Sequence, residues 1–272
     1  CSTTTAWYWT SPDCVWKSND PMSAQSICQT LVLGLLLARP AGSPADELKP
    51  VSPIGSGHRL AWHDEFDGDR LDTGKWTYRI DTRFWSVQRA ENVSVADGYL
   101  RLALKKEKQG EFEYTAGGVI SRETFQYGYY EARFRCPPGA GWHTSFWMMR
   151  HDWRKTADEP AAVQEIDVCE QDSVNRTSYS VNLHRWKPGP HVSHGYKRIT
   201  TPDLAAEFHV WGCEFTPQRI DYYFDGRLVQ SLDATVIPHG PQNIWLTSVA
   251  APLGGTKSVD DSKLPAIAEF DY

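Results

Sequence analysis

The feature that most constrains the fold is the interruption of residues 58–272 by turn signals at intervals of roughly 8–12 residues. The stretch ENVSVADGYLRLALKKE predicts two strands joined at Asp97-Gly98, a dipeptide that favours a tight hairpin turn. Apolar and polar residues alternate through GGVISRETFQYGYYEARFRC, which predicts two more strands with a break at Gly128. No segment keeps a helical period for long. The pattern predicts an all-β domain in which two antiparallel sheets stack as a β-sandwich.

A third stretch, HVWGCEFTPQRIDYYFDGRLVQSL, predicts three strands with turns at Thr216-Pro217 and Asp225-Gly226. The chain has 272 residues and 40% hydrophobic content, enough for one large core, and shows no internal repeat. Its net charge of −6 gives no basic footprint, so we expect neither a nucleic acid nor an anionic membrane as partner. Twelve tryptophans favour a flat binding surface, with core packing as the alternative for many of them.

The amino-terminal part has a different composition. Residues 1–21 show no helical or strand period, and we expect an unstructured upstream segment or an artefact. Residues 22–45 hold an apolar run of about twelve residues followed by small residues and prolines, typical of a signal peptide and too short to span a bilayer. A short hydrophobic helix packed on the domain is the alternative. Residues 46–57 read as a linker, and we expect a secreted or periplasmic domain over 58–272, free of the membrane once the signal is removed.

The cysteines form no regular framework. The body holds Cys136, Cys169 and Cys213, an odd number with no CxxC spacing, which argues against a zinc site. We expect buried free thiols, with one disulfide as the alternative.

The segment QEIDVCEQ at 164–171 holds three acids out of phase. On a regular strand Glu165 and Asp167 share one face, while Ile166, Val168 and Glu170 share the other. If the apolar pair marks the core side, Glu170 is buried among apolar side chains, and an unpaired carboxylate there is costly.

A β-bulge between Asp167 and Glu170 removes this conflict. One extra residue resets the phase, returns Glu170 to the face of Glu165 and Asp167, and turns Cys169 away. Three acids on one face repel one another, so at least one proton is shared or retained at neutral pH.

This arrangement suits glycoside hydrolysis, which needs an ionised carboxylate as nucleophile and a carboxyl of raised pKa as general acid. Retaining enzymes hold the two about 5–5.5 Å apart. The middle Asp167 can hydrogen-bond the nucleophile. A solvated acidic strand or a calcium-binding edge is the alternative when the segment is taken alone.

The neighbouring motifs favour the catalytic interpretation. In chain order they are FDGDRLDTGKW, RAENVSVADGYLRL, GGVISRETFQYGYYEARFR, GWHTSFWMM, EIDVCE and FHVWGCEFTPQRIDYYFDGRLV. From about Trp62 to Tyr272 the chain closely resembles glycoside hydrolase family 16, and EIDVCE resembles the bulged signature of its laminarinases, agarases, porphyranases and carrageenases. The resemblance implies a concave, concanavalin-like jelly roll with an open cleft, retention of anomeric configuration and no catalytic cofactor. We expect a monomer acting on a polysaccharide.

The resemblance also implies roles for individual residues. Glu165 matches the nucleophile, Asp167 the auxiliary acid and Glu170 the general acid/base. Arg89 and Asn92, in RAEN, match positions that donate to sugars, with a turn-capping pair as the alternative.

Four tryptophans and one histidine complete the candidate substrate site. Trp147 resembles a sugar platform, with core packing as the alternative, and core packing is favoured for Trp142. His184 and Trp186 lie on the next expected strand, near the acid/base. Trp153 precedes the catalytic strand and either rims the cleft or packs on the surface.

Many members of the family bind a structural calcium on the convex side. The matching positions are the Gly98 carbonyl and Asp271.

The substrate is less defined than the mechanism. Gln164 stands where laminarinase-like members more often carry Gly, and DEPAAVQ differs from the run typical of a β-1,3-glucanase. We expect an endo-acting hydrolase of a β-1,3- or mixed-linkage glucan first and of a red-algal galactan second. Sulfated galactans require basic residues in the cleft, for which the candidates are His143, His184, Arg185 and Lys187, or these are ordinary surface residues.

Three other functions remain open. A transglycosylase would use the same covalent intermediate. A non-catalytic carbohydrate-binding module would share the sandwich but has no use for two converging glutamates. A structural or adhesive secreted domain would leave the tryptophans unexplained.

Overall fold

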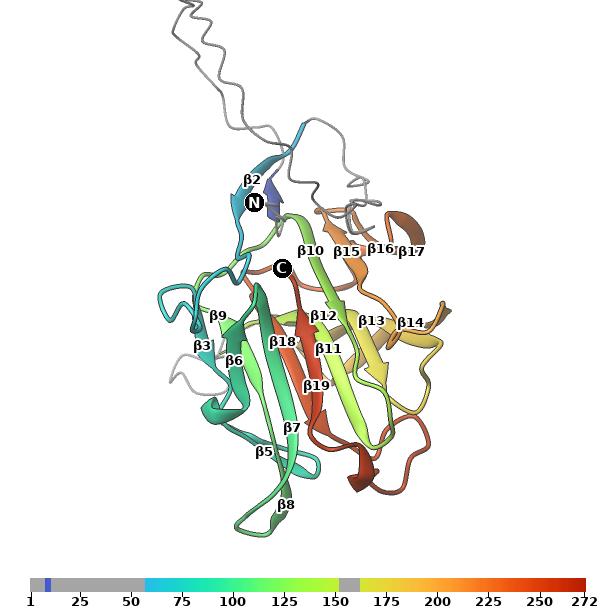
Figure 1. Cartoon of the computed structure of the whole chain (residues 1–272). Helices are drawn as coiled ribbons and strands as arrows, with labels where there is room; N and C mark the ends of the chain where they lie inside the picture. The colour runs from blue at the N-terminus through green and yellow to red at the C-terminus, as the bar shows by residue number, and fades with distance from the viewer. Residues whose placement is uncertain (1–7, 11–56, 152–161) are drawn as a thin grey trace, which may run out of the picture.

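The computed structural model describes residues 8–10, 57–151 and 162–272 (Figure 1). The expected boundaries of the segments 1–21, 22–45 and 46–57 lie almost wholly outside these residues, as does Trp153, and they stay predictions. In the described part only three single-turn 3₁₀ helices accompany the strands. These are η1 (Ala90–Asn92), η2 (Ala234–Val236) and η3 (Asp261–Lys263). The expectation of an all-β fold is confirmed.

The strands form two stacked sheets, as in a jelly roll (Figure 1). The smaller sheet has seven strands, and its strands pair antiparallel throughout. Its spatial order is β14 (Val192–Thr200), β13 (Ser178–Lys187), β12 (Val163–Asp172), β11 (Trp142–Met149), β18 (Asn243–Ala250), β9 (Gly118–Ser121) and β3 (Trp76–Tyr78).

The larger sheet covers the other side of the core. Its main path is β17 (Arg227–Asp233), β16 (Arg219–Phe224), β15 (His209–Phe215), β10 (Gly128–Arg135), β19 (Ala266–Phe270), β7 (Tyr99–Gln109), β8 (Phe112–Ala116), β5 (Ser86–Gln88) and β4 (Thr82–Arg83). Three further strands join it, β1 (Tyr8–Thr10), β2 (Arg59–Trp62) and β6 (Val93–Ala96). Among its pairs only β5–β8 is parallel in the described residues.

The core lies between the two sheets. Phe134 of β10 stacks on Trp211 of β15 with ring centroids 3.8 Å apart, and on Phe270 of β19 at 4.6 Å. Phe146 and Ile166, from the smaller sheet, belong to the same buried cluster. Burial of apolar side chains from both sheets is the main contribution to the stability of such a sandwich.

The expected hairpin turns are present. Asp97 and Gly98 have φ angles of 56° and 78°, and Asp225 and Gly226 have 46° and 74°. Two successive positive φ angles are what a two-residue turn requires, and glycine adopts them without a Cβ penalty. β10 begins at Gly128, as the alternation predicted.

The amino-terminal residues contribute one feature that the sequence did not indicate. Tyr8–Thr10 forms the short strand β1, which pairs antiparallel with both β2 and β10. Regular structure is therefore present in three residues of the segment expected to be unstructured. No helix in the described part of the chain is long and apolar enough to cross a membrane.

The three body cysteines are free and buried, which confirms the expectation of free thiols.

Candidate active site

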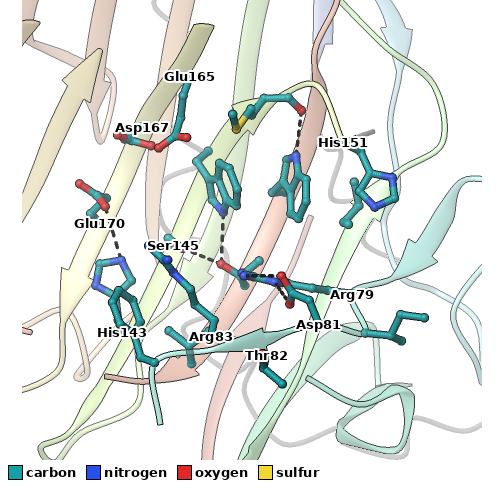
Figure 2. A pocket seen from close by; sticks show the side chains of 18 of the residues that line it. Arg79, Asp81, Thr82, Arg83, His143, Ser145, His151, Glu165, Asp167 and Glu170 are labelled. Atoms are coloured by element: carbon teal, nitrogen blue, oxygen red, sulfur yellow. Dashed lines mark hydrogen bonds and ion pairs between the residues drawn. The ribbon is translucent and has the colours of Figure 1, made fainter. Parts of the chain in front are cut away.

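A cleft of about 570 Å³ lies on the seven-stranded sheet (Figure 2). Its floor comes from β11, β12 and β18, and one wall comes from residues 77–84, between β3 and β5. All three acids of the EIDVCE segment open into it. The side chains that line the cleft include Arg83, His143, Ser145, Trp147, Glu165, Asp167, Glu170, Trp186, Trp245 and Thr247.

The bulge expected in β12 is present. Along β13, Asp167 pairs with Asn182 and Glu170 with Ser180, so three steps on β12 match two on its neighbour. The same slip occurs against β11, where Trp147 faces Asp167 and Phe146 faces Cys169. One residue of β12 is therefore extra with respect to both neighbouring strands.

The burial of each side chain follows from this shift. Ile166, Val168 and Cys169 are all buried in the core cluster, so two consecutive residues point inward at the bulge. Glu165 and Glu170 are only partly buried and line the cleft. The predicted destination of Cys169, away from the cleft, is confirmed.

The three carboxyls differ in how readily they ionise. Burial, followed by the charge of Glu165 and a hydrogen bond with it, raises the pKa of Asp167 well above its ordinary value. Burial, followed by the charge of Asp167, raises the pKa of Glu170 to about 8. The Glu170 side chain retains 32% exposure, so a substrate reaches it from the cleft. Burial and the nearby negative charge both disfavour the ionised form of the carboxyl, and Glu170 keeps its proton at neutral pH.

Glu165 and Asp167 receive support from β13. Trp186 Nε1 donates a hydrogen bond of 2.8 Å to Glu165 Oε2. His184 Nε2 lies 3.0 Å from Asp167 Oδ2, and the Asp167 side chain is almost fully buried. The structure thus brings Trp186 to Glu165 and His184 to Asp167, and of the two only Trp186 lines the cleft.

These contacts also bear on metal binding. Among the described residues, the acid and histidine groups close enough to share one ion are Glu165, Asp167 and His184, with ligand atoms within 4.8 Å of one another. The same carboxylate already accepts from Trp186, and two adjacent acids with one raised pKa share protons readily. Proton sharing accounts for the geometry without an ion.

Glu170 is flanked by His143 of β11. His143 Nε2 lies 3.7 Å from Glu170 Oε1, and its Nδ1 is 2.9 Å from Asp172 Oδ1. Asp172 thereby orients the imidazole, which points toward Glu170 in Figure 2. The sequence analysis considered His143 only as a candidate basic group for sulfated substrates.

Trp147 forms part of the cleft floor. It stacks on Trp245 of β18 with ring centroids 4.4 Å apart, and its Nε1 donates to Thr247 Oγ1 at 3.2 Å. Ser145 shares a 2.6 Å hydrogen bond with the same hydroxyl. A fixed, partly exposed indole beside the acids fits the expected sugar platform.

Three expected substrate contacts are not at the cleft. Trp142 is 1% exposed, packs in the core and donates its Nε1 to Pro137 O, so the core alternative is right and the substrate assignment is wrong. Arg89 donates its guanidinium to Glu91 and Gln109.

Asn92 is also committed elsewhere. It is buried and donates to Thr115 Oγ1 at 2.9 Å, and neither it nor Arg89 lines the cleft. Arg89 precedes and Asn92 ends the turn η1, but Arg89 makes no side-chain capping hydrogen bond there, so the structure supports neither the expected sugar contacts nor the turn-capping alternative.

The expected calcium position carries competing contacts. Asp271 is buried and forms an ion pair with Arg133, which occupies one carboxylate oxygen. Gly98 lies in the turn between β6 and β7. A cation bound at Asp271 would have to compete with an arginine, and the calcium site stays a prediction.

Two parts of the cleft are not indicated by the sequence pattern. Ser145 and Trp245 were not singled out, although Ser145 lies two residues from Trp147 and so shares its face on a strand. The wall that carries Arg79, Asp81 and Arg83 belongs to a stretch with no recognisable period. Arg79 is held there by a bidentate contact with Asp81.

Comparison with known proteins agrees with this geometry. A family profile described as "Beta-porphyranase A-D, GH16 domain" matches residues 60–245. The Glucan endo-1,3-beta-glucosidase A1 of Niallia circulans is 26% identical over 82% of this chain and 38% of its own length. The Beta-glucanase of Rhodothermus marinus is 28% identical over 78% of this chain and 83% of its own length.

Solved structures agree on the fold. The laminarinase from Flavobacterium sp. UMI-01 has a TM-score of 0.69 and 24% identity, covering 78% of this chain and 97% of that one. A concave β-sandwich with paired glutamates in its cleft defines the class of jelly-roll glycosidases. The match over residues 60–245 places the chain within that class, and it belongs to glycoside hydrolase family 16.

The raised pKa of Glu170 predicts a pH-dependent cost to stability. The folded protein binds this proton more tightly than the unfolded chain, so stability is lost as the pH rises from about 4.5 to about 8. Glu170→Gln removes the ionisable group. The variant should melt at a higher temperature than the wild type at about pH 9 and at nearly the same temperature at about pH 4.

Differential scanning calorimetry at both pH values measures this difference. Glu111→Gln, an exposed position between β7 and β8, is the control and should show no such trend. An equal shift of the Glu170→Gln variant at both pH values would mean that Glu170 ionises normally.

Proposed function

We propose that the chain is a retaining endo-β-glycanase that hydrolyses a β-linked polysaccharide by double displacement. The observation that carries the proposal is the pair Glu165 and Glu170 on one face of the bulged strand, in different environments. Glu165 accepts a hydrogen bond from Trp186, and Glu170 holds a proton at neutral pH. An ionised nucleophile beside a protonated acid is what retaining hydrolysis requires.

In the first step Glu165 attacks the anomeric carbon. The bond from that carbon to the glycosidic oxygen breaks, and Glu170 gives its proton to the departing oxygen. Trp186 donates to Oε2 of Glu165 and so orients the attacking carboxylate. Loss of the Glu170 proton leaves a carboxylate, and the charge that Glu165 carried is consumed in the ester.

In the second step water attacks the same carbon from the opposite side. The carboxylate of Glu170 removes a proton from this water, and the bond to Glu165 breaks. Both glutamates return to their starting charge. Asp167 contributes by its hydrogen bond with Glu165, which changes strength as the nucleophile gains and loses charge.

A neutral β-1,3- or mixed-linkage glucan is the first candidate substrate, because relatives over most of the chain are named as glucanases. The chain spans only 38% of the first of these relatives, so their activity is carried over as a proposal. The stacked Trp147 and Trp245 supply an apolar floor for a pyranose ring of either substrate.

A galactan with anionic substituents is the second candidate, favoured by Arg83. This side chain lines the cleft on the side of His143 and Ser145 (Figure 2). Its guanidinium lies 4.1 Å from the ring centroid of Phe84, and no carboxylate pairs with it among the described residues. A guanidinium that pairs with no protein carboxylate can bind a sulfate or carboxylate group of the substrate.

Removing either glutamate tests the mechanism. Glu165→Ala and Glu170→Ala should each lower kcat by at least about 10³-fold on whichever of laminarin, lichenan, agarose, porphyran and carrageenan is cleaved. With an activated aryl glycoside, azide should restore turnover in both variants. The product should be an α-glycosyl azide from Glu165→Ala and a β-glycosyl azide from Glu170→Ala, identified by NMR.

The outcomes separate the alternatives. Wild-type rates in either variant would contradict the assignment of that glutamate. Binding without cleavage of all five polysaccharides by the wild type would favour a carbohydrate-binding module. Sugar transfer exceeding hydrolysis would indicate a transglycosylase.

Substitution of Arg83 distinguishes the two substrates. If the substrate is anionic, Arg83→Ala should raise KM at least about 10-fold on sulfated chains and leave neutral glucan unchanged, since one charge-assisted contact is worth about 1.5–3 kcal/mol. Arg227→Ala, exposed on the larger sheet, is the matched control. An unchanged KM on a sulfated substrate would remove Arg83 as its anchor.

A further inference from the structure

His191 immediately precedes β14 and is outside the cleft-lining residues, yet it contacts two side chains that touch the proposed catalytic acids. Its ring stacks on Trp186 with centroids 4.1 Å apart and an interplanar angle of 27°. Its ring also lies beside that of His184, with centroids 5.0 Å apart and an interplanar angle of 24°. The exposed imidazole of His191 therefore contacts both Trp186, which donates to Glu165, and His184, which lies beside Asp167.

The hydrogen bonds around Asn182 fix its amide. Leu183 N–H and Ser193 O–H both donate to Asn182 Oδ1, at 2.9 and 3.0 Å. Oδ1 is therefore the acceptor, and the other amide atom, Nδ2, is a donor. Nδ2 lies 3.0 Å from His184 Nε2, so this imidazole nitrogen accepts.

The tautomer of His184 follows. If Nε2 accepts, a neutral His184 carries its proton on Nδ1. Nδ1 lies 2.9 Å from His191 Nε2, which must then be the acceptor. His191 is accordingly neutral, with its own proton on Nδ1.

This tautomer affects the proton on Asp167. The lone pair of His184 Nε2 lies 3.0 Å from Asp167 Oδ2. An ionised Asp167 would place a negative oxygen against that lone pair, whereas a protonated Asp167 removes the repulsion. A protonated Asp167 in turn lets Glu165, its hydrogen-bonded neighbour, be the acid that carries the negative charge.

We propose that His191 is a positioning residue for the nucleophile. By accepting from His184 Nδ1 it acts together with the Asn182 amide to hold that imidazole in the tautomer that keeps the proton on Asp167, and by stacking it holds the Trp186 indole on Glu165. The catalytic consequence rests on the proposed function, but the tautomer of His184 does not. The two parts can therefore be tested separately.

Three substitutions separate the hydrogen bond from the stack. His191→Ala removes both, His191→Phe keeps a ring on Trp186 without an acceptor, and His191→Gln keeps an acceptor without the ring. Partners of this kind contribute about 10- to 100-fold to the function of the groups they orient. We expect kcat to fall by about that factor in His191→Ala and by less in the other two, with KM changed less than about twofold.

The tautomer is measured on the resting protein by long-range ¹H–¹⁵N NMR of the histidine rings. His184 should be protonated at Nδ1 in the wild type and in His191→Gln, and should shift toward Nε2–H in His191→Ala and His191→Phe. This readout needs no substrate, so it stands even if the chain cleaves none of the five polysaccharides. His194→Ala, three residues further along and outside the stack, is the matched control and should change neither readout.

Two results would overturn the proposal. An Nε2–H tautomer of His184 in the wild type would refute the hydrogen-bond direction on which it depends. A raised KM with unchanged kcat in His191→Ala would make His191 a sugar contact and not a positioning residue. Melting temperatures within a few degrees of the wild type exclude loss of the fold as the cause.

Discussion

One extra residue in β12 determines where all three acids lie. Because side chains on a strand alternate, Glu165 and Glu170 would occupy opposite faces of a regular strand. The bulge changes this by sending Val168 and Cys169 inward in succession, so that Glu170 emerges beside Asp167. The cleft, its electrostatics and the proposed division of labour between the glutamates all depend on that shift.

Because the three acids lie close together, protons stay on some of the carboxyls at neutral pH. Asp167 and Glu170 are harder to ionise because of their burial and of neighbouring charges, which raise the pKa of each. Trp186 Nε1 donates a hydrogen bond to Glu165 Oε2, whereas His143 Nε2 lies 3.7 Å from Glu170 Oε1. Asp167, buried between them, sets the balance and is itself controlled through His184.

The sequence was sufficient for the parts that follow a period. The alternation of Ile166 and Val168 against the acids predicted the bulge, and turn dipeptides such as Asp97-Gly98 predicted the hairpins. Trp186 was found because it shares a strand with His184.

Contacts between segments that are far apart in the sequence are not indicated by any periodic pattern. Trp142 and Trp147 lie five residues apart on β11, so alternation places them on opposite faces of the sheet. Which of the two faces is the core and which lines the cleft is shown only by packing. Arg83 and His191 lie in connections or at strand ends, where no period operates. Their positions depend on how loops fold back over the sheet, which a local pattern does not specify.

The central claim is that the bulge creates a carboxyl at position 170 that stays protonated at neutral pH beside an ionised Glu165. The most direct measurement is a ¹³C NMR titration of the glutamate carboxyls, with the Glu170→Gln variant used to assign the signal. The account predicts one glutamate with a pKa of about 8 that disappears in the variant. A signal that disappears in the variant but titrates in the ordinary range near 4.5 in the wild type would contradict it.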